Sequence, residues 1–68
     1  MDEELLNIQV RRFLKKVGMQ SQREIEQAVK DHIRNGSLSG AEKLDATMLL
    51  EVPELNLKVS IDGKIKIE

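Results

Sequence analysis

The fold of the first half of this chain is decided by residues 16–24, which are KVGMQSQRE. Gly18 is typical of the residue just past a helix C-terminus, because glycine adopts the left-handed conformation without strain. Ser21 and Glu24 have the spacing of a capping box, in which both side chains satisfy free amides at a helix N-terminus. We therefore predict that one helix ends before Gly18 and that a second begins after Ser21.

Apolar residues on both sides of this stretch recur with helical spacing. On the N-terminal side the stripe consists of Leu6, Val10, Phe13, Leu14 and Val17. On the C-terminal side it consists of Ile25, Ala28, Val29, His32 and Ile33. The sequence thus predicts helices over about 3–17 and 22–35, arranged as an αα-hairpin or a helix-turn-helix.

Beyond residue 40 the apolar residues alternate, as in strands with one apolar face. They fall on even positions from Leu44 to Val52, and on odd positions from Leu55 onward. Pro53-Glu54 is typical of a turn of two residues, or of four with Val52 and Leu55. Asp62-Gly63 is typical of a second turn, in a three-residue loop with Ile61. We therefore predict strands over about 44–52, 55–61 and 64–68.

These elements predict a single α+β domain, residues 1–68, of order ααβββ. The two helices are expected to pack on one face of a three-stranded antiparallel β-meander. The expected core is aliphatic apart from one phenylalanine: Leu6, Val10, Phe13, Leu14, Val17, Ile25, Val29, Ile33, Met48, Leu50, Leu57, Val59 and Ile65.

The composition is that of a small globular protein and disfavours an enzyme. The chain has 68 residues, of which 40% are hydrophobic and 34% charged, with a net charge of −1 and no cysteine. His32 is the only histidine, and no glycine-rich phosphate motif is present. We expect no catalytic, cofactor-binding or metal-binding residue and no small-molecule substrate. Without a basic leader or a long apolar run, we expect a cytoplasmic protein that does not bind a membrane.

One candidate site is a basic face on the expected second helix. At about 100° per residue, Arg23, Gln27, Lys30 and Arg34 lie within roughly 60° of one another. A winged-helix-like domain presents such a face to nucleic acid, and Arg11 and Arg12 would add backbone contacts. Neighbouring acids and a sequence pI of about 5.8 weigh against this alternative.

The second candidate site is apolar. Leu5 and Ile8 lie on a different side of the first helix from its apolar stripe. A cluster of exposed apolar residues marks an interface, so this side is a candidate self-association surface. The leading hypothesis is a non-enzymatic interaction module that binds an unknown protein partner or a second copy of itself.

The first half of the chain also resembles a known family. Asn7, followed by VRRFLKKVG at residues 10–18 and SQREIE at residues 21–26, resembles a domain of unknown function found in short proteobacterial proteins. The resemblance implies a bacterial, cytoplasmic protein. It supplies no activity, partner or site residue.

Overall fold

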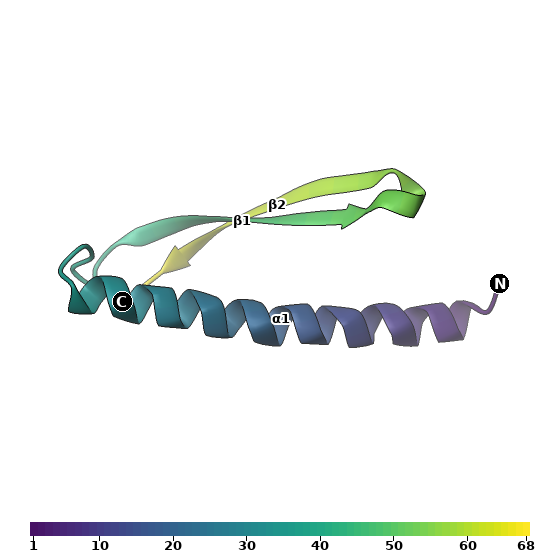
Figure 1. Ribbon diagram of the computed structural model, residues 1–68, viewed down its shortest axis with the longest axis horizontal. Coiled ribbons are helices and arrows are strands. Elements are labelled where there is room, and N and C mark those ends of the chain that lie inside the picture. Colours follow the sequence, from purple (N-terminus) through teal and green to yellow (C-terminus); the bar gives the residue numbers. More distant parts are fainter. The chain divides into compact units, whose positions relative to one another are not determined.

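A computed structural model describes all 68 residues and contains one long helix and one β-hairpin (Figure 1). The elements in chain order are α1 (Glu3–Arg34), β1 (Lys43–Val52), the short 3₁₀ helix η1 (Pro53–Leu55) and β2 (Leu57–Lys66). The prediction of two helices and a three-stranded meander is therefore wrong. The chain divides into two compact units, Met1–Ser37 and Leu38–Glu68, which are described in turn.

The ends of α1 are defined by its own side chains and backbone. The carboxylate of Asp2 accepts a hydrogen bond of 3.0 Å from the backbone N–H of Leu5, so Asp2 is the N-cap. Glu3 and Glu4 in the first turn complement the helix dipole. At the other end, Asn35 is the C-cap and Gly36 follows with a φ of 86°, a conformation that favours glycine.

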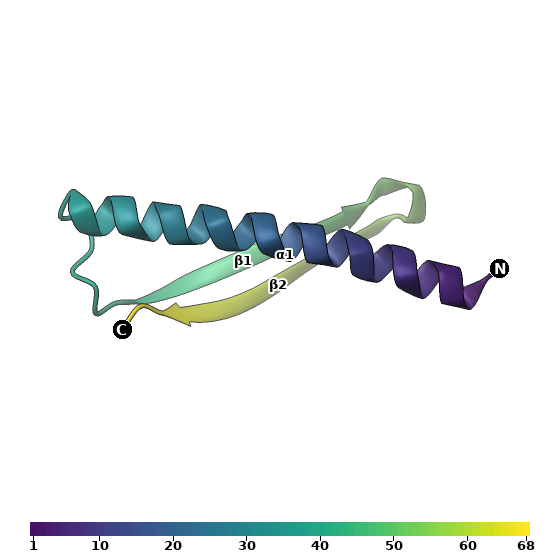
Figure 2. The ribbon, with the colours of Figure 1, turned by 90° about the horizontal axis from the view of Figure 1, so that it is seen from below.

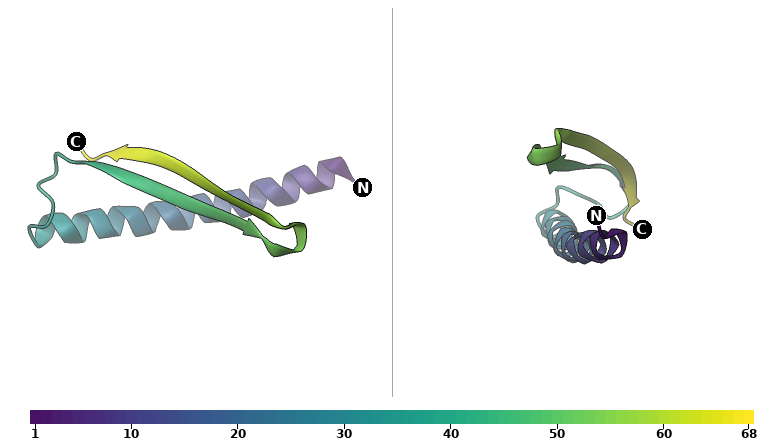
Figure 3. Two further views of the ribbon diagram at one scale, coloured as in Figure 1. Left: turned by 90° about the horizontal axis from the view of Figure 1, so that it is seen from above. Right: turned by 90° about the vertical axis from the view of Figure 1, so that its right-hand side faces the viewer.

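The helix continues through Gly18, where a break was expected, and Figure 3 shows α1 as one unbroken helix. Gly18 does not have a positive φ, unlike Gly36 and Gly40. A glycine inside a helix costs only about 1 kcal/mol relative to alanine, whereas ending a helix leaves unsatisfied backbone groups at both new termini. The apolar stripe also keeps its phase across the glycine, with steps of three or four residues from Leu14 through Val17 and Ser21 to Ile25.

In the second unit, β1 and β2 form a two-stranded antiparallel sheet, a twisted ribbon in Figure 2. The alternation predicts a strand over about 44–52, and β1 lies there. The register pairs Val52 with Leu57 next to the turn and Lys43 with Lys66 at the open end. Apolar residues face each other along one side of the ribbon in the pairs Leu44–Ile65, Ala46–Gly63, Met48–Ile61, Leu50–Val59 and Val52–Leu57.

The turn predicted at Asp62-Gly63 does not form, because both residues lie inside β2. Asp62 pairs with Thr47 and Gly63 pairs with Ala46. The apolar residues keep odd numbers on both sides of this dipeptide, as in one uninterrupted strand, since side chains alternate with a period of two. The prediction of two strands over 55–61 and 64–68 is therefore wrong, because these residues form the single strand β2.

The turn predicted around Pro53 does form. Four residues, Pro53 to Asn56, connect the paired residues Val52 and Leu57, so the loop is even in length but one residue further along than expected. Asn56 adopts the left-handed conformation, with φ 51° and ψ 32°, and its N–H donates to the Pro53 carbonyl at 3.1 Å. Asparagine tolerates this conformation better than most residues.

The predicted core does not form within either unit taken by itself. Neither unit buries a side chain of its own, and Phe13, the largest residue expected in the core, is 56% exposed. The expected core required a second helix beside the first and a third strand beside the hairpin. A single continuous helix cannot enclose its own apolar stripe, and a two-stranded hairpin cannot enclose its own apolar face.

Candidate interaction surfaces

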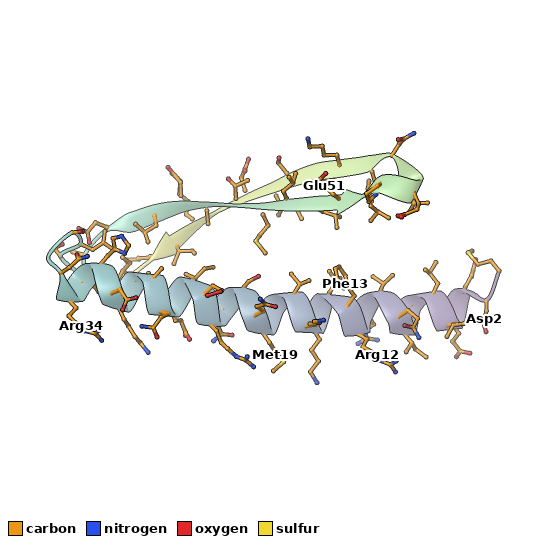
Figure 4. The ribbon with its side chains drawn as sticks, in the orientation of Figure 1. Asp2, Arg12, Phe13, Met19, Arg34 and Glu51 are labelled. Atoms are coloured by element: carbon orange, nitrogen blue, oxygen red, sulfur yellow. The ribbon has the colours of Figure 1, made fainter.

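The residues of the expected basic face all lie on α1, together with Arg11 and Arg12, which the sequence predicts on a separate helix. At 100° per residue, Arg12 joins Arg23, Gln27, Lys30 and Arg34 within roughly 60° of the helix surface. Arg12, Met19 and Arg34 project from one side of α1 and Phe13 from the other (Figure 4). Arg11 lies about 100° from Arg12 and is separate from this group.

Only one of these basic residues forms an ion pair. Arg34 Nη1 lies 3.5 Å from Asp31 Oδ1, and the Gln27 side-chain amide donates to the same oxygen at 2.9 Å. Both contacts are exposed and join residues three or four apart, so they support the helix surface by only a few tenths of a kcal/mol each.

The structure removes the helix-turn-helix interpretation of this face. A helix-turn-helix places a recognition helix in the major groove while a first helix crosses the DNA backbone. Here both predicted helices are parts of one straight element, so no second helix is presented at an angle to the first. The predicted winged-helix-like domain is accordingly wrong.

The candidate self-association residues Leu5 and Ile8 are 52% and 49% exposed. They lie about 60° apart around α1, on the side that also carries Met19. The larger apolar surface of the helix lies elsewhere, on the side of Phe13. That surface, called here the α1 seam, consists of the apolar residues Leu6, Val10, Leu14, Val17, Ile25 and Ala28, with the polar residues Ser21 and His32 at the same spacing.

His32, the only histidine, bonds within its own helix. Its Nδ1 lies 2.8 Å from the carbonyl oxygen of Ala28, and because a carbonyl only accepts, Nδ1 carries the proton in this contact. The ring is thereby held along the α1 seam. Within the whole chain, no group of three or more histidine, cysteine, aspartate or glutamate side chains lies close enough to hold a metal ion.

One ion pair and one hydrogen bond join the two strands on the polar face of the hairpin. Lys64 forms an ion pair with Asp45, and the Thr47 hydroxyl donates to Asp62 at 3.0 Å. These contacts occupy the polar face and leave the opposite face of the ribbon apolar. The hairpin and α1 therefore each present one apolar surface.

The segment before β1 is fixed by the Glu42 carboxylate. Its oxygens accept hydrogen bonds from the backbone N–H groups of Ser39 at 2.8 Å and Gly40 at 3.0 Å, and from the Ser39 hydroxyl at 3.1 Å. The backbone hydrogen bond from Ser39 is the main cause that lowers the pKa of Glu42 from 4.5 to about 2. The hydrogen-bond partners of the Glu42 carboxylate therefore all lie in its own turn.

Together these features define a small α+β protein, one long amphipathic helix followed by a β-hairpin, with exposed apolar surfaces. No helix in it is long and apolar enough to cross a membrane. A model described as "Family of unknown function (DUF6494)" matches residues 1–68, and the chain belongs to that family. Neither the curated proteins nor the solved structures include a match.

Proposed function

We propose that this chain is a small, non-enzymatic protein-interaction module that binds its partner through exposed apolar surface. One observation carries the proposal. Neither unit buries a side chain of its own, and sixteen large apolar side chains are exposed. Monomeric soluble proteins rarely leave so much contiguous apolar surface in contact with water, and such surface marks interaction sites.

Each unit also needs packing of its apolar face for stability. Most helical stability in proteins comes from packing of an apolar face rather than from helix propensity, and an isolated two-stranded hairpin is marginal in water. The single histidine is held by its own helix, which supports a binding role over general acid–base chemistry. The proposal includes a cytoplasmic setting in proteobacteria, which rests on the resemblance of residues 7–26 to proteobacterial proteins.

Site-specific photocrosslinking in the cells that make the protein tests the proposal. A diazirine amino acid replaces Leu14 on the α1 seam in one variant and Arg12 on the opposite side in the control. We expect covalent protein adducts from position 14 at several times the yield from position 12. Absence of adducts at position 14, or equal yields at both positions, would overturn the proposal.

A further inference from the structure

The side of α1 opposite the seam carries a long row of basic residues, called here the basic stripe. It consists of Arg12, Lys16, Arg23, Lys30 and Arg34. At 100° per residue these five lie within roughly 40° of the helix surface, and they span roughly 33 Å along its axis. In Figure 4, Arg12 and Arg34 project from the same side of α1. The stripe is one surface only because α1 continues through Gly18.

The charges of the basic stripe have little neutralisation from their own helix. Arg34 forms the one ion pair of the first unit, an exposed contact of 3.5 Å with Asp31. The acid nearest the rest of the stripe is Glu26, which accepts a hydrogen bond from Gln22 at 3.4 Å instead. The other four basic residues therefore have no ion-pair partner in α1. Because like charges four residues apart destabilise an exposed helix, a bound anion would relieve repulsion along the stripe.

Three residues of the stripe converge on one place. Arg12, Lys16 and Arg23 line a shallow hollow in the helix surface beside Met19. Guanidinium and ammonium groups donate charge-assisted hydrogen bonds to phosphate oxygens, which are among the stronger hydrogen bonds in proteins. Cations from successive turns of α1 can therefore bind neighbouring anionic groups of one ligand.

The narrow, elongated form of the stripe favours a linear polyanion, and its side chains favour one that lacks bases. Proteins that bind single-stranded nucleic acid stack the bases on aromatic side chains. The only aromatic residue, Phe13, projects from the other side of α1 (Figure 4). An acidic peptide would have to order a flexible side chain for each carboxylate, which costs conformational entropy. A chain of phosphate groups alone has neither requirement.

We propose that the basic stripe binds a linear inorganic polyphosphate chain, which lies along α1. The stripe and the α1 seam occupy opposite sides of the helix, so this inference is independent of the protein partner proposed above. Each phosphate group held by one basic residue raises the effective concentration of the next group along the chain. The affinity therefore rises with the length of the polyphosphate until the chain spans the stripe.

Isothermal titration calorimetry of the full chain with sodium polyphosphate tests the proposal. We expect binding at low salt that weakens with a log–log slope of about −3, as for four or five contacts on a single-stranded polyanion. The double variant Lys16→Glu with Arg23→Glu should bind at least about tenfold more weakly. The control, Arg11→Glu with Lys58→Glu, changes the net charge equally but off the stripe, and it should stay within about threefold of the natural chain.

Four outcomes would overturn the proposal, once circular dichroism has verified that each variant is helical. The first is an absence of binding to polyphosphate at low salt. The second is an equal loss of affinity in the two double variants, which would indicate a general effect of charge. The third is equal affinity for orthophosphate at the same total phosphate concentration. The fourth is tighter binding of oligothymidylate or poly-L-glutamate with the same number of charges.

Discussion

The helix and the hairpin differ in how far along the sequence their polar contacts reach. In α1 the side-chain hydrogen bonds join residues three or four apart, as from Gln27 to Asp31 and from His32 to Ala28. In the hairpin they join the two strands, as from Thr47 to Asp62. The hairpin therefore has a register fixed by its own cross-strand partners, whereas α1 has only local bonds. The stability of α1 therefore depends more than that of the hairpin on packing against its apolar surface.

Breaking α1 in its middle should have the largest effect. Proline at position 20 removes one helical hydrogen bond and clashes with the preceding turn, so Gln20→Pro should lower the free energy of unfolding by about 3 kcal/mol. Far-ultraviolet circular dichroism and denaturant titration, at one fixed protein concentration, measure the loss. The control Gln20→Ala keeps the helix. Equal stability of the proline and alanine variants would show that α1 is not continuous through residue 20.

The turn of the hairpin should be sensitive to one residue only. Asn56 has a positive φ of 51°, and a residue with a Cβ and no local hydrogen-bonding group is strained there by about 1–2 kcal/mol. Asn56→Ala should therefore lower the free energy of unfolding by about 1 kcal/mol, while Asn56→Gly should leave it unchanged or raise it. Denaturant titration compares the two. A hairpin that tolerates alanine as well as glycine would contradict the left-handed turn.

Two glycines in the first unit should respond in opposite directions. Gly18 lies inside α1 without a positive φ, and a Cβ added there meets no atom within 4 Å. Gly18→Ala should therefore stabilise the protein by up to about 1 kcal/mol. Gly36 has a φ of 86°, so Gly36→Ala should destabilise it by about 1 kcal/mol. Thermal melts of both variants show whether the stability rises or falls. A Gly18→Ala variant that is less stable than the natural chain would indicate a helix end at residue 18.

The smallest effect should be confined to the segment before β1. Hydrogen bonds to the ionised Glu42 lower its pKa in the folded chain from 4.5 to about 2. Its stabilising contribution is therefore complete above pH 4.5 and is lost as the pH falls through about 2. Amide NMR shifts of Ser39 and Gly40 should move in this acidic range and stay constant in Glu42→Gln. Shifts that titrate near the ordinary glutamate pKa would contradict the hydrogen-bonded turn.

The alternating pattern was sufficient to predict where β1 lies and that a turn follows it at Pro53. The two errors, at Gly18 and at Asp62-Gly63, have one cause. In each case a local signal for a break was given more weight than the phase of the apolar pattern, which continues unchanged across it. A helix end or a strand end normally resets that phase, so its persistence from Leu14 to Ile25, and from Val59 to Ile65, indicates a continuous element.

The candidate surfaces were predictable only in part. The grouping of Arg23, Lys30 and Arg34 follows from helical spacing alone, so it survives the merging of the two predicted helices. The α1 seam was not visible as one surface, because dividing the helix at Gly18 hid the steps of three or four residues that continue across it. The exposure of a surface depends on how many helices and strands are available to pack on it. The sequence prediction had one helix and one strand too many.

Site-specific photocrosslinking from both sides of α1 tests the central claim most directly. Leu14 lies on the α1 seam and Arg12 on the opposite side of the helix, so the account predicts protein adducts from a diazirine at position 14 at several times the yield from position 12. Equal yields at the two positions, or no adducts from position 14, would contradict the account.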